Sequence, residues 1–345
     1  MPVKTKPTKA PKSGSANSTG KRAPSGTPSV FIDGEAGTTG IEIRERLQGI
    51  SGITVRSIAA ELRKDADARR ALMSGVDVVI LCLPDDAAKE AAKLAGSLGE
   101  TGPRIIDASS AHRVSPGWVY GFAELDPAQK AAIRSARHVT NPGCYPTGGI
   151  ALLRPLVAAG LMAADHPVTV NAVSGYSGGG SAMIEAYEAK NTPSKARNSA
   201  SNAPSFELYG LGLEHKHVPE LQRYSQLSRR PIFVPSVGNF RKGMLVSVPL
   251  HLDTLPGKPK AADLEAALTA HYAGAKLVKV IAAGDKSSAG GRLEAEGVND
   301  TDLIELRVFA NEAHRQAVLV ARLDNLGKGA SGAAVQNLQI MLGLD

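Results

Sequence analysis

Cysteine is scarce in this sequence: 345 residues contain two, Cys82 and Cys144. Two cysteines cannot form a disulfide framework, and the sequence has no closely spaced Cys and His pairs of the kind that bind structural zinc, so we expect no metal. Uninterrupted apolar runs are also short, and none approaches the length of a membrane span. These absences predict a soluble protein of the reducing cytoplasm with no membrane partner.

Acidic residues are missing from residues 1–27, which carry six Lys and Arg residues and therefore all but one of the seven net positive charges. The segment is rich in Ser, Thr, Pro, Gly and Lys, and is too polar to bury enough surface to fold. We expect a disordered basic tail, either native or appended. It lacks the apolar core of a secretory signal, although an organellar transit peptide would also lack acids. Because the rest of the chain is almost neutral, we expect no nucleic-acid partner.

The remaining sequence has a globular composition, with 43% hydrophobic and 21% charged residues, and is long enough for two domains. Strand and helix patterns alternate over residues 28–146, which predicts a doubly wound, Rossmann-like α/β domain that binds a nucleotide. A second, α+β domain is expected at 147–320, followed by a helix within 321–345. Strands are expected at 29–34, 53–60, 76–84 and 104–110 in the first domain, and at 168–174, 232–234, 244–250, 277–281, 303–309 and 316–321 in the second.

The first expected strand runs into a glycine-rich turn with the spacing G-x-x-G-x-x-G, formed by Gly34, Gly37 and Gly40. A helix is expected to open there, near Thr38 and Thr39. Glycines let a pyrophosphate approach the backbone closely, and the amides that open a helix supply donors and a positive dipole end. These five residues are our candidates for binding a dinucleotide. A strand-to-helix turn without a ligand can also require glycine.

The residues after the second strand indicate which nicotinamide cofactor is bound. A free ribose 2′-hydroxyl usually meets an Asp or Glu near the end of this strand. Here the sequence offers Ser57, Arg63 and Lys64, with Glu61 as the only acid before Asp65. Hydroxyl and basic groups suit a 2′-phosphate, so we expect NADP(H), with Ser57 and Arg63 among its ligands. Exposed Arg and Lys residues are also common at helix starts that bind no cofactor, which weakens this preference for NADP(H).

The two cysteines have different surroundings. Cys82 lies in the apolar run at 76–84, where a buried thiol has a raised pKa and acts as a small hydrophobe. Cys144 follows a Pro-Gly turn, just ahead of a helix that the apolar pattern starts near residue 146 or 147. A helix N-terminus lowers the pKa of a thiol and offers donors to an oxyanion. Cys144 is therefore a candidate nucleophile, with a structural cysteine in a turn as the alternative.

The segment around this cysteine, Asn-Pro-Gly-Cys-Tyr-Pro-Thr at 141–147, resembles the active-site signature of the N-acetyl-gamma-glutamyl-phosphate reductases. Further segments resemble the same family in order along the chain, so that only the basic tail falls outside. They are 34–40, 107–113, 118–122, 174–180, 215–220 and 324–330. The stretch at 233–243 resembles the shorter of the family's two sequence types.

This resemblance implies NADPH-dependent reduction of N-acetyl-L-glutamyl 5-phosphate to the 5-semialdehyde and phosphate, in arginine biosynthesis. It implies that the domain at 147–320 is of the semialdehyde dehydrogenase type and carries catalysis and the contacts of a homo-oligomer, a dimer or a tetramer. It also implies that the helix within 321–345 returns to the nucleotide-binding domain, with Asn325 near the nicotinamide.

Reduction of an acyl phosphate requires a nucleophile for the acyl group, a cation for the departing phosphate and a hydride donor. Cys144 is expected to form a thioester. His217 is our candidate to deprotonate Cys144 and later to protonate the hemithioacetal oxygen, because imidazole titrates near neutrality. His215 is the competitor: alternate residues of an extended strand point to opposite faces, so we expect only one of the two to reach the thiol. Without the family motif at 215–220, two partly exposed surface histidines would be an equally good interpretation.

Arg113 is our candidate for binding the phosphate, since a guanidinium offers paired donors to phosphate oxygens. A salt bridge from Arg113 to an acid such as Glu124 is the alternative. Ser110, a hydroxyl at the end of the preceding strand, is a second candidate ligand. The glycine-rich loop at 174–180, which includes Gly178, either places backbone donors near the nicotinamide or the substrate, or only connects two elements.

Two other functions fit parts of the sequence. Aspartate-semialdehyde dehydrogenases share the overall plan and the chemistry, but the segment at 215–220 and the context of Cys144 argue against them. A nucleotide-binding or nucleic-acid-binding protein without catalysis fits only the glycine turn and the basic tail. The sequence also leaves open whether the amine of the substrate is acetylated or carries another protecting group.

Overall fold

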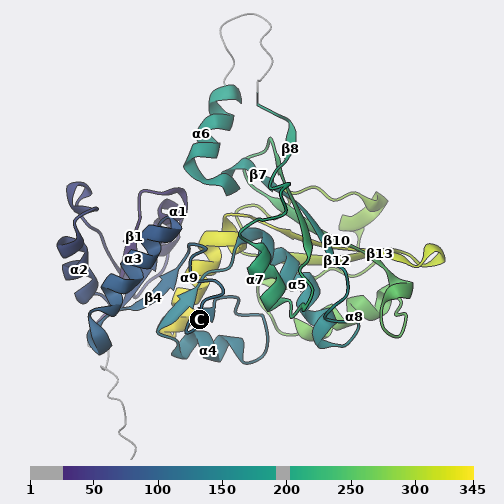
Figure 1. The fold of residues 1–345 in the computed structure, drawn as a ribbon, viewed down its shortest axis with the longest axis horizontal. Coiled ribbons are helices and arrows are strands. Elements are labelled where there is room, and N and C mark those ends of the chain that lie inside the picture. The colour runs from purple at the N-terminus through teal and green to yellow at the C-terminus, as the bar shows by residue number, and fades with distance from the viewer. Residues whose placement is uncertain (1–25, 192–202) are drawn as a thin grey trace, which may run out of the picture.

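The computed structural model describes residues 26–191 and 203–345, which form two β-sheets with helices packed on them (Figure 1). The tail expected at 1–27 lies outside the described residues except for its last two positions. No helix in these two ranges is long and apolar enough to span a membrane. The same ranges hold no group of three or more His, Cys, Asp or Glu side chains placed to bind a metal ion.

Six parallel strands build the first sheet, in the order β2-β1-β3-β4-β6-β5. They are β1 (Ser29–Asp33), β2 (Thr54–Arg56), β3 (Val78–Leu81), β4 (Arg104–Asp107), β5 (Val119–Tyr120) and β6 (His138–Thr140). The central strand β3 is buried at every residue, as expected of a strand covered on both faces. β2 is shorter than the predicted 53–60 because it is an edge strand, largely exposed, and the chain leaves the sheet after Arg56.

Helices cover both faces of this sheet. They are α1 (Thr38–Gln48), α2 (Ala66–Ser74), α3 (Asp85–Gly96), α4 (Gln129–Ser135) and, from the end of the chain, α9 (Gly332–Leu342). Successive strand residues point to opposite faces, so Ile32 of β1 packs with α1, α4 and α9, whereas Phe31 packs with α2 and α3. This doubly wound arrangement confirms the predicted Rossmann-like fold.

The second sheet is mixed and has the order β11-β12-β13-β10-β7-β9-β8. Its strands are β7 (Thr169–Gly175), β8 (Phe206–Leu208), β9 (Ile232–Gly238), β10 (Met244–His251), β11 (Val278–Val280), β12 (Ile304–Asn311) and β13 (Gln316–Leu323). All six strands predicted here are present. β8 was missed because it is an exposed edge strand without buried alternation. β9 continues past residue 234 because residues 235–238 pair with β7, and Pro235, which lacks an amide hydrogen, still accepts a hydrogen bond from the Tyr209 N–H through its carbonyl.

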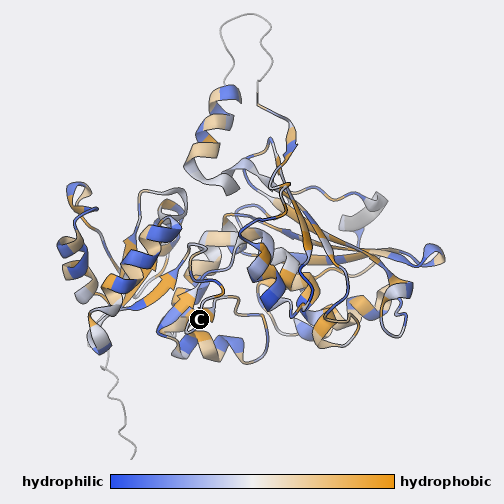
Figure 2. Ribbon diagram, viewed as in Figure 1, coloured by the Kyte–Doolittle hydropathy of each residue, from blue (hydrophilic) through white to orange (hydrophobic). Residues whose placement is uncertain are grey.

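One face of the second sheet is covered by α5 (Cys144–Ala158), α7 (Val218–Tyr224) and α8 (Ala261–His271), whose apolar side chains share a core with the strands. The other face carries an apolar groove, at which Phe206 and Val318 are exposed. Figure 2 shows hydrophobic residues running along the strands of both sheets. The second domain therefore keeps one face of its sheet open.

The last segment of the chain connects the second sheet back to the first. After β13 it makes a π-helical turn, Gly327–Ser331, and continues directly into α9, which packs on the first sheet beside α1 and α4. Residues near the C-terminus therefore lie between the two sheets. The domain boundaries near residues 146 and 320 stay predictions.

Candidate active site

A cavity of about 380 Å³ is lined by connecting segments from both sheets. Several residues predicted for the site line it together: Thr38, Thr39, Arg113, Cys144, Gly178, His215, His217 and Asn325. Other predicted residues lie outside this lining: Gly34, Gly37, Gly40, Ser57, Arg63 and Ser110. The fold thus gathers the candidate nucleophile, both histidines and the start of α1 into one pocket.

Cys144 is the first residue of α5, with Gly143 as the N-cap, so the helix begins earlier than predicted. The thiol is partly exposed and lines the pocket, yet burial by the surrounding protein raises its pKa to about 11. The Arg113 guanidinium and the amides of Cys144 and Tyr145 act in the opposite direction, while the Glu220 carboxylate adds to the rise. The expectation of a lowered thiol pKa is therefore wrong, because burial outweighs the helix terminus and the arginine.

His215 and His217 lie in the turn that enters α7, where His217 is the N-cap residue. Because this segment is not an extended strand, the two rings do not point to opposite faces. Their centroids are 4.7 Å apart, and both rings line the pocket. The backbone N–H of His217 donates to Nδ1 of His215 at 3.2 Å. Both histidines therefore face the pocket, and which of them reaches the thiol stays a prediction.

Both imidazoles are neutral at pH 7. Burial lowers the pKa of His215 to about 4, with Lys216 and Arg113 contributing. Burial, and then Arg113 and His215, hold the pKa of His217 well below its usual value. Nδ1 of His217 is buried without a hydrogen-bond partner within the part of the chain that the structure describes. A neutral imidazole with an unbonded nitrogen can take a proton from a neighbouring group.

Arg113 is buried and does not pair with Glu124. Its Nη1 donates to Glu220 Oε2 at 3.1 Å, and its Nε donates to the carbonyl of Asn141 at 3.1 Å. Glu124 pairs instead with the buried Lys328, at 2.8 Å. Arg113 thus forms the salt bridge considered as its alternative role, but with Glu220 in place of Glu124, and its guanidinium also lines the pocket.

Glu220 organises the turn before the cysteine, and sequence reasoning missed it. Its buried carboxylate accepts hydrogen bonds from the Gly143 N–H at 2.8 Å and from the Tyr120 hydroxyl at 2.7 Å, besides the bond from Arg113. A Cβ on Gly143 would lie 2.8 Å from His217 Nε2, so glycine is needed where these groups converge. The only signal for Glu220 was its place at the end of the segment at 215–220.

The glycines of the first turn serve different purposes. Gly34 has a φ of 94°, and a Cβ there would collide with the Cys82 carbonyl, while a Cβ on Gly40 would collide with the Gly34 carbonyl. Packing of the chain therefore requires both. Gly37 is the N-cap of α1, and a Cβ there would meet nothing closer than 3.5 Å. Because α1 has no side-chain cap and no acid in its first turn, its first amides can face an anion.

The two predicted 2′-phosphate ligands converge on a carboxylate that the sequence did not single out. Ser57 Oγ donates to Glu35 Oε2 at 2.9 Å, and Arg63 Nη2 pairs with Glu35 Oε1 at 3.3 Å. Ser110 has a different partner: its N–H and hydroxyl donate to the Asp85 carboxylate at 3.0 and 2.6 Å. The hydroxyl of Ser110 is thus already engaged by the protein.

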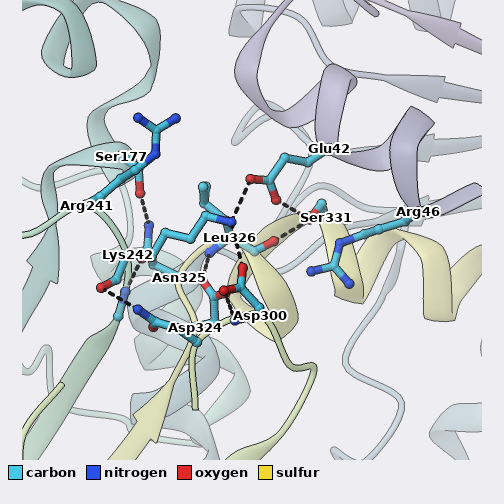
Figure 3. A network of polar contacts seen from close by, with 12 residues as sticks. Glu42, Arg46, Ser177, Arg241, Lys242, Asp300, Asp324, Asn325, Leu326 and Ser331 are labelled. Carbon is cyan, nitrogen blue, oxygen red and sulfur yellow. Dashed lines mark hydrogen bonds and ion pairs between the residues drawn. The ribbon is translucent and has the colours of Figure 1, made fainter. Parts of the chain in front are cut away.

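Asn325 supports the glycine loop at 174–180 from the C-terminal segment (Figure 3). Its Oδ1 accepts from the Gly243 N–H and its Nδ2 donates to Ser177 Oγ, both at 2.9 Å. Gly178 follows in the same loop, where a Cβ would lie 2.8 Å from Ser174 Oγ. The amide of Asn325 is therefore used to hold the loop, which in turn lines the pocket.

The surrounding network ties α1 to the second domain (Figure 3). Lys242 reaches Glu42 of α1 at 3.3 Å and Asp300 at 3.1 Å. Arg46, one turn further along α1, pairs with Asp302 at 2.8 Å. These ion pairs thus connect α1, the helix that follows the glycine turn, to the segments that line the opposite side of the pocket.

The chemical capacity of the pocket follows from these groups. A thiol can attack a carbonyl carbon, and the amides of Cys144 and Tyr145, which face the sulfur, can stabilise an oxyanion beside it. Arg113 and Lys216 line the same pocket and suit an anionic substrate. Lys216, between the two histidines, was not predicted as a ligand. The arrangement fits acyl transfer from an acid derivative that carries a negative leaving group.

Two protein-family models match the chain. The model described as "Semialdehyde dehydrogenase, NAD binding domain" matches residues 54–133, and that described as "Semialdehyde dehydrogenase, dimerisation domain" matches residues 144–325. These matches agree with the two-sheet fold and with a nicotinamide dinucleotide at the first sheet.

Curated relatives match over almost the whole chain. An N-acetyl-gamma-glutamyl-phosphate reductase of Brucella ovis is 54% identical over 316 residues, which are 92% of this chain and 99% of the relative. One of Trichormus variabilis is 51% identical over 319 residues, 92% of this chain and 97% of the relative.

Solved structures of lower sequence identity share the fold. Aspartate semialdehyde dehydrogenase II from Vibrio cholerae, complexed with ASA, has a TM-score of 0.68 at 19% identity and covers 92% of this chain and 99% of its own. Aspartate semialdehyde dehydrogenase with NADP from Candida albicans has a TM-score of 0.63 at 14% identity, with coverages of 92% and 98%. Likeness at these identities concerns the fold alone.

Proposed function

This chain belongs to the N-acetyl-gamma-glutamyl-phosphate reductase family of oxidoreductases, and we propose that it reduces N-acetyl-L-glutamyl 5-phosphate with NADPH to N-acetyl-L-glutamate 5-semialdehyde and phosphate, in arginine biosynthesis. The observation that carries the proposal is the single pocket in which Cys144, Arg113 and the start of α1 meet. A nucleophile, a cation for phosphate and a dinucleotide-binding helix are the parts that this reaction requires.

The residues around the start of α1 fit a nicotinamide dinucleotide. Gly37 offers a bare backbone face, the first amides of α1 can receive the pyrophosphate, and Thr38 and Thr39 line the pocket. When bound, the nicotinamide supplies the hydride that reduces the thioester. We propose NADP rather than NAD because the exposed cation Arg63 follows β2; the Ser57 hydroxyl donates to Glu35 and supports Arg63 through that carboxylate.

In the first half-reaction the Cys144 sulfur attacks the acyl carbon, the bond from that carbon to the phosphate oxygen breaks, and a thioester forms. Because the pKa of the thiol is about 11, the thiol loses its proton as it attacks, with the neutral His217 as acceptor. Arg113 and Lys216 stabilise the departing phosphate, which takes its proton from solvent. The amides of Cys144 and Tyr145 stabilise the oxyanion.

In the second half-reaction His217 donates its proton to the hemithioacetal oxygen. When the carbon–sulfur bond breaks, that proton passes to the sulfur, which restores the Cys144 thiol and releases the semialdehyde. Asn325 acts by holding the loop with Ser177 against the pocket. Ser110 is no longer among our phosphate ligands, because its hydroxyl is bonded to Asp85.

The reaction run backwards tests the proposal: phosphate-dependent reduction of NADP by N-acetyl-L-glutamate 5-semialdehyde, with wild type against Cys144→Ser. We expect wild-type turnover and a loss of more than about a hundredfold in the variant, because a serine hydroxyl is rarely ionised and is a poor leaving group. Cys82→Ser is the matched control and keeps its activity, since Cys82 is a core thiol whose pKa burial raises to about 12. A Cys144→Ser enzyme that retains more than a few per cent of the rate contradicts the thioester.

The same assay separates the two histidines. We propose His217 because its Nδ1 is without a partner among the described residues, and His215 is the competitor because its ring lines the same pocket. His217→Asn should lose about a hundredfold or more in kcat, the usual size of a general acid–base contribution. His215→Asn should lose less. The reverse order would assign the proton transfers to His215.

We further propose a homo-oligomer, a dimer or a tetramer, that forms through the open apolar face of the second sheet, where Phe206, Leu208 and Val318 are exposed. A matched family model with the description "dimerisation domain" supports this. The proposed domains stay at 28–146, 147–320 and 321–345. We place the enzyme in the cytoplasm because a catalytic thiol must remain reduced.

A further inference from the structure

A charged cluster lies at the carboxyl end of β2, outside the catalytic pocket. Its centre is the Glu35 carboxylate, from the glycine turn after β1. Glu35 Oε2 accepts from Arg44 Nη1 at 2.8 Å and from Ser57 Oγ at 2.9 Å, and Oε1 pairs with Arg63 Nη2 at 3.3 Å. Three segments, α1, the end of β2 and the loop before α2, thus converge on one carboxylate.

The members of the cluster differ in their exposure to solvent. The Glu35 side chain is 4% exposed, whereas those of Arg44 and Arg63 are 47% and 42% exposed. Each guanidinium has five N–H donors and spends one of its nitrogens on the carboxylate beneath it. An anion that arrives from solvent therefore meets the two arginines first, and the carboxylate lies behind them.

An acid near the end of β2 commonly accepts the ribose hydroxyls of a dinucleotide. Glu35 is not placed for that role, because its side chain is buried beneath the two arginines and both of its oxygens already accept from Ser57 or an arginine. Its charge has a different consequence. Two neighbouring guanidinium groups repel each other, and a carboxylate between them offsets the repulsion and fixes their planes.

We propose that Glu35 is a positioning residue that holds Arg44 and Arg63 as a preformed clamp for the 2′-phosphate of NADPH. Arg44, which no sequence pattern indicated, becomes a ligand equal to Arg63. The inference rests on the proposed function, in that it takes NADPH as the cofactor. It adds the reason for the preference: the cations are fixed before the cofactor binds, which lowers the entropic cost of binding.

Fluorescence titration of the full chain with NADPH and with NADH tests the clamp, since the two cofactors differ only in the 2′-phosphate. Wild type should bind NADPH more tightly. Arg44→Ala and Arg63→Ala should each weaken NADPH binding by about tenfold or more and leave NADH almost unchanged, as expected for a lost hydrogen bond to a charged group. Glu35→Gln should weaken NADPH binding by a smaller factor, again without changing NADH. Arg70→Ala, an exposed arginine of α2, is the control and should leave both affinities unchanged.

Other outcomes of this titration would overturn the role of Glu35, the role of Arg44 or the choice of cofactor. Tighter NADPH binding by Glu35→Gln would mean that the carboxylate competes with the phosphate. Equal weakening of both cofactors by Glu35→Gln would give it a ribose or structural role. A wild type that prefers NADPH, with Arg44→Ala unchanged, would sink the clamp and leave the proposed function intact. A wild type that prefers NADH would overturn the NADPH part of the proposed function, and the clamp with it.

Discussion

Two carboxylates in this molecule have similar partners in different surroundings. Glu220 lies behind Arg113 at the turn before Cys144, and Glu35, in the glycine turn before α1, lies behind Arg44. The Arg113 side chain is 10% exposed and that of Arg44 is 47% exposed. A buried cation that loses its partner cannot regain hydration, whereas a half-exposed one can. Burial therefore makes Arg113 depend more strongly on Glu220 than Arg44 depends on Glu35.

The largest difference between the two regions should appear in stability. Glu220→Gln leaves the buried Arg113 without its counter-ion and should lower the free energy of unfolding by about 3 kcal/mol or more. The matched variant Glu35→Gln leaves two solvated arginines and should lower it by less than about 1 kcal/mol. Urea unfolding of both variants at low and high salt measures the two losses. Equal losses would contradict the expected difference between the two carboxylates, because burial would then not decide the contribution of either acid to stability.

A second effect separates chemistry from cofactor binding. Arg113→Lys should reduce kcat/KM in the phosphate-dependent assay by about a hundredfold, because an ammonium cannot bind Glu220, the Asn141 carbonyl and a phosphate at once. Its affinity for NADPH should not change. The matched variant Arg44→Lys should lose a few-fold in NADPH affinity with kcat unchanged. Steady-state kinetics at saturating NADP gives kcat and kcat/KM, and fluorescence titration with NADPH gives the affinity of each variant. A loss of NADPH affinity in Arg113→Lys would show that the two sites are not separate.

A third prediction concerns the pH dependence of the reactivity of the Cys144 thiol. Burial raises the pKa of Cys144 to about 11, so the thiol is protonated at neutral pH and its thiolate fraction rises as pH increases toward that value. Alkylation of Cys144 by iodoacetamide should therefore accelerate by about tenfold per pH unit between pH 7 and 9, with no plateau. Mass spectrometry against Cys144→Ser corrects for Cys82. A plateau below pH 8 would mean that Arg113 and the helix terminus outweigh burial after all.

Local patterns in the sequence predicted most of the fold. Buried strands such as β3 and β7 carry continuous or alternating apolar residues, and the periodicity of α5 marks a helix. The features that were not predicted, β8 and the exact start of α5, lack such a pattern. β8 is exposed at every residue, and the backbone of the first turn of α5 is fixed by a distant carboxylate, Glu220.

The site residues that could be predicted are those whose side-chain type alone indicates a chemical role. Cys144, His217 and Arg113 were singled out as nucleophile, base and cation, and the fold brings them into one pocket. Glu220 and Glu35 were not, since an acid acquires these roles only through burial and through partners from other segments. The same limit explains the wrong direction of the Cys144 pKa: the helix terminus is visible in the sequence, and the burial that opposes it is not.

The wall of the pocket beside Cys144 comes from the last part of the chain. Leu326, Gly329 and Ala330 line the cavity, and a Cβ on Gly329 would lie 3.0 Å from Cys144 Cβ. During synthesis the cysteine is made long before these residues. The nascent chain therefore carries its proposed nucleophile before this wall of the pocket exists, and we expect a chain that ends before Leu326 to lack the proposed activity.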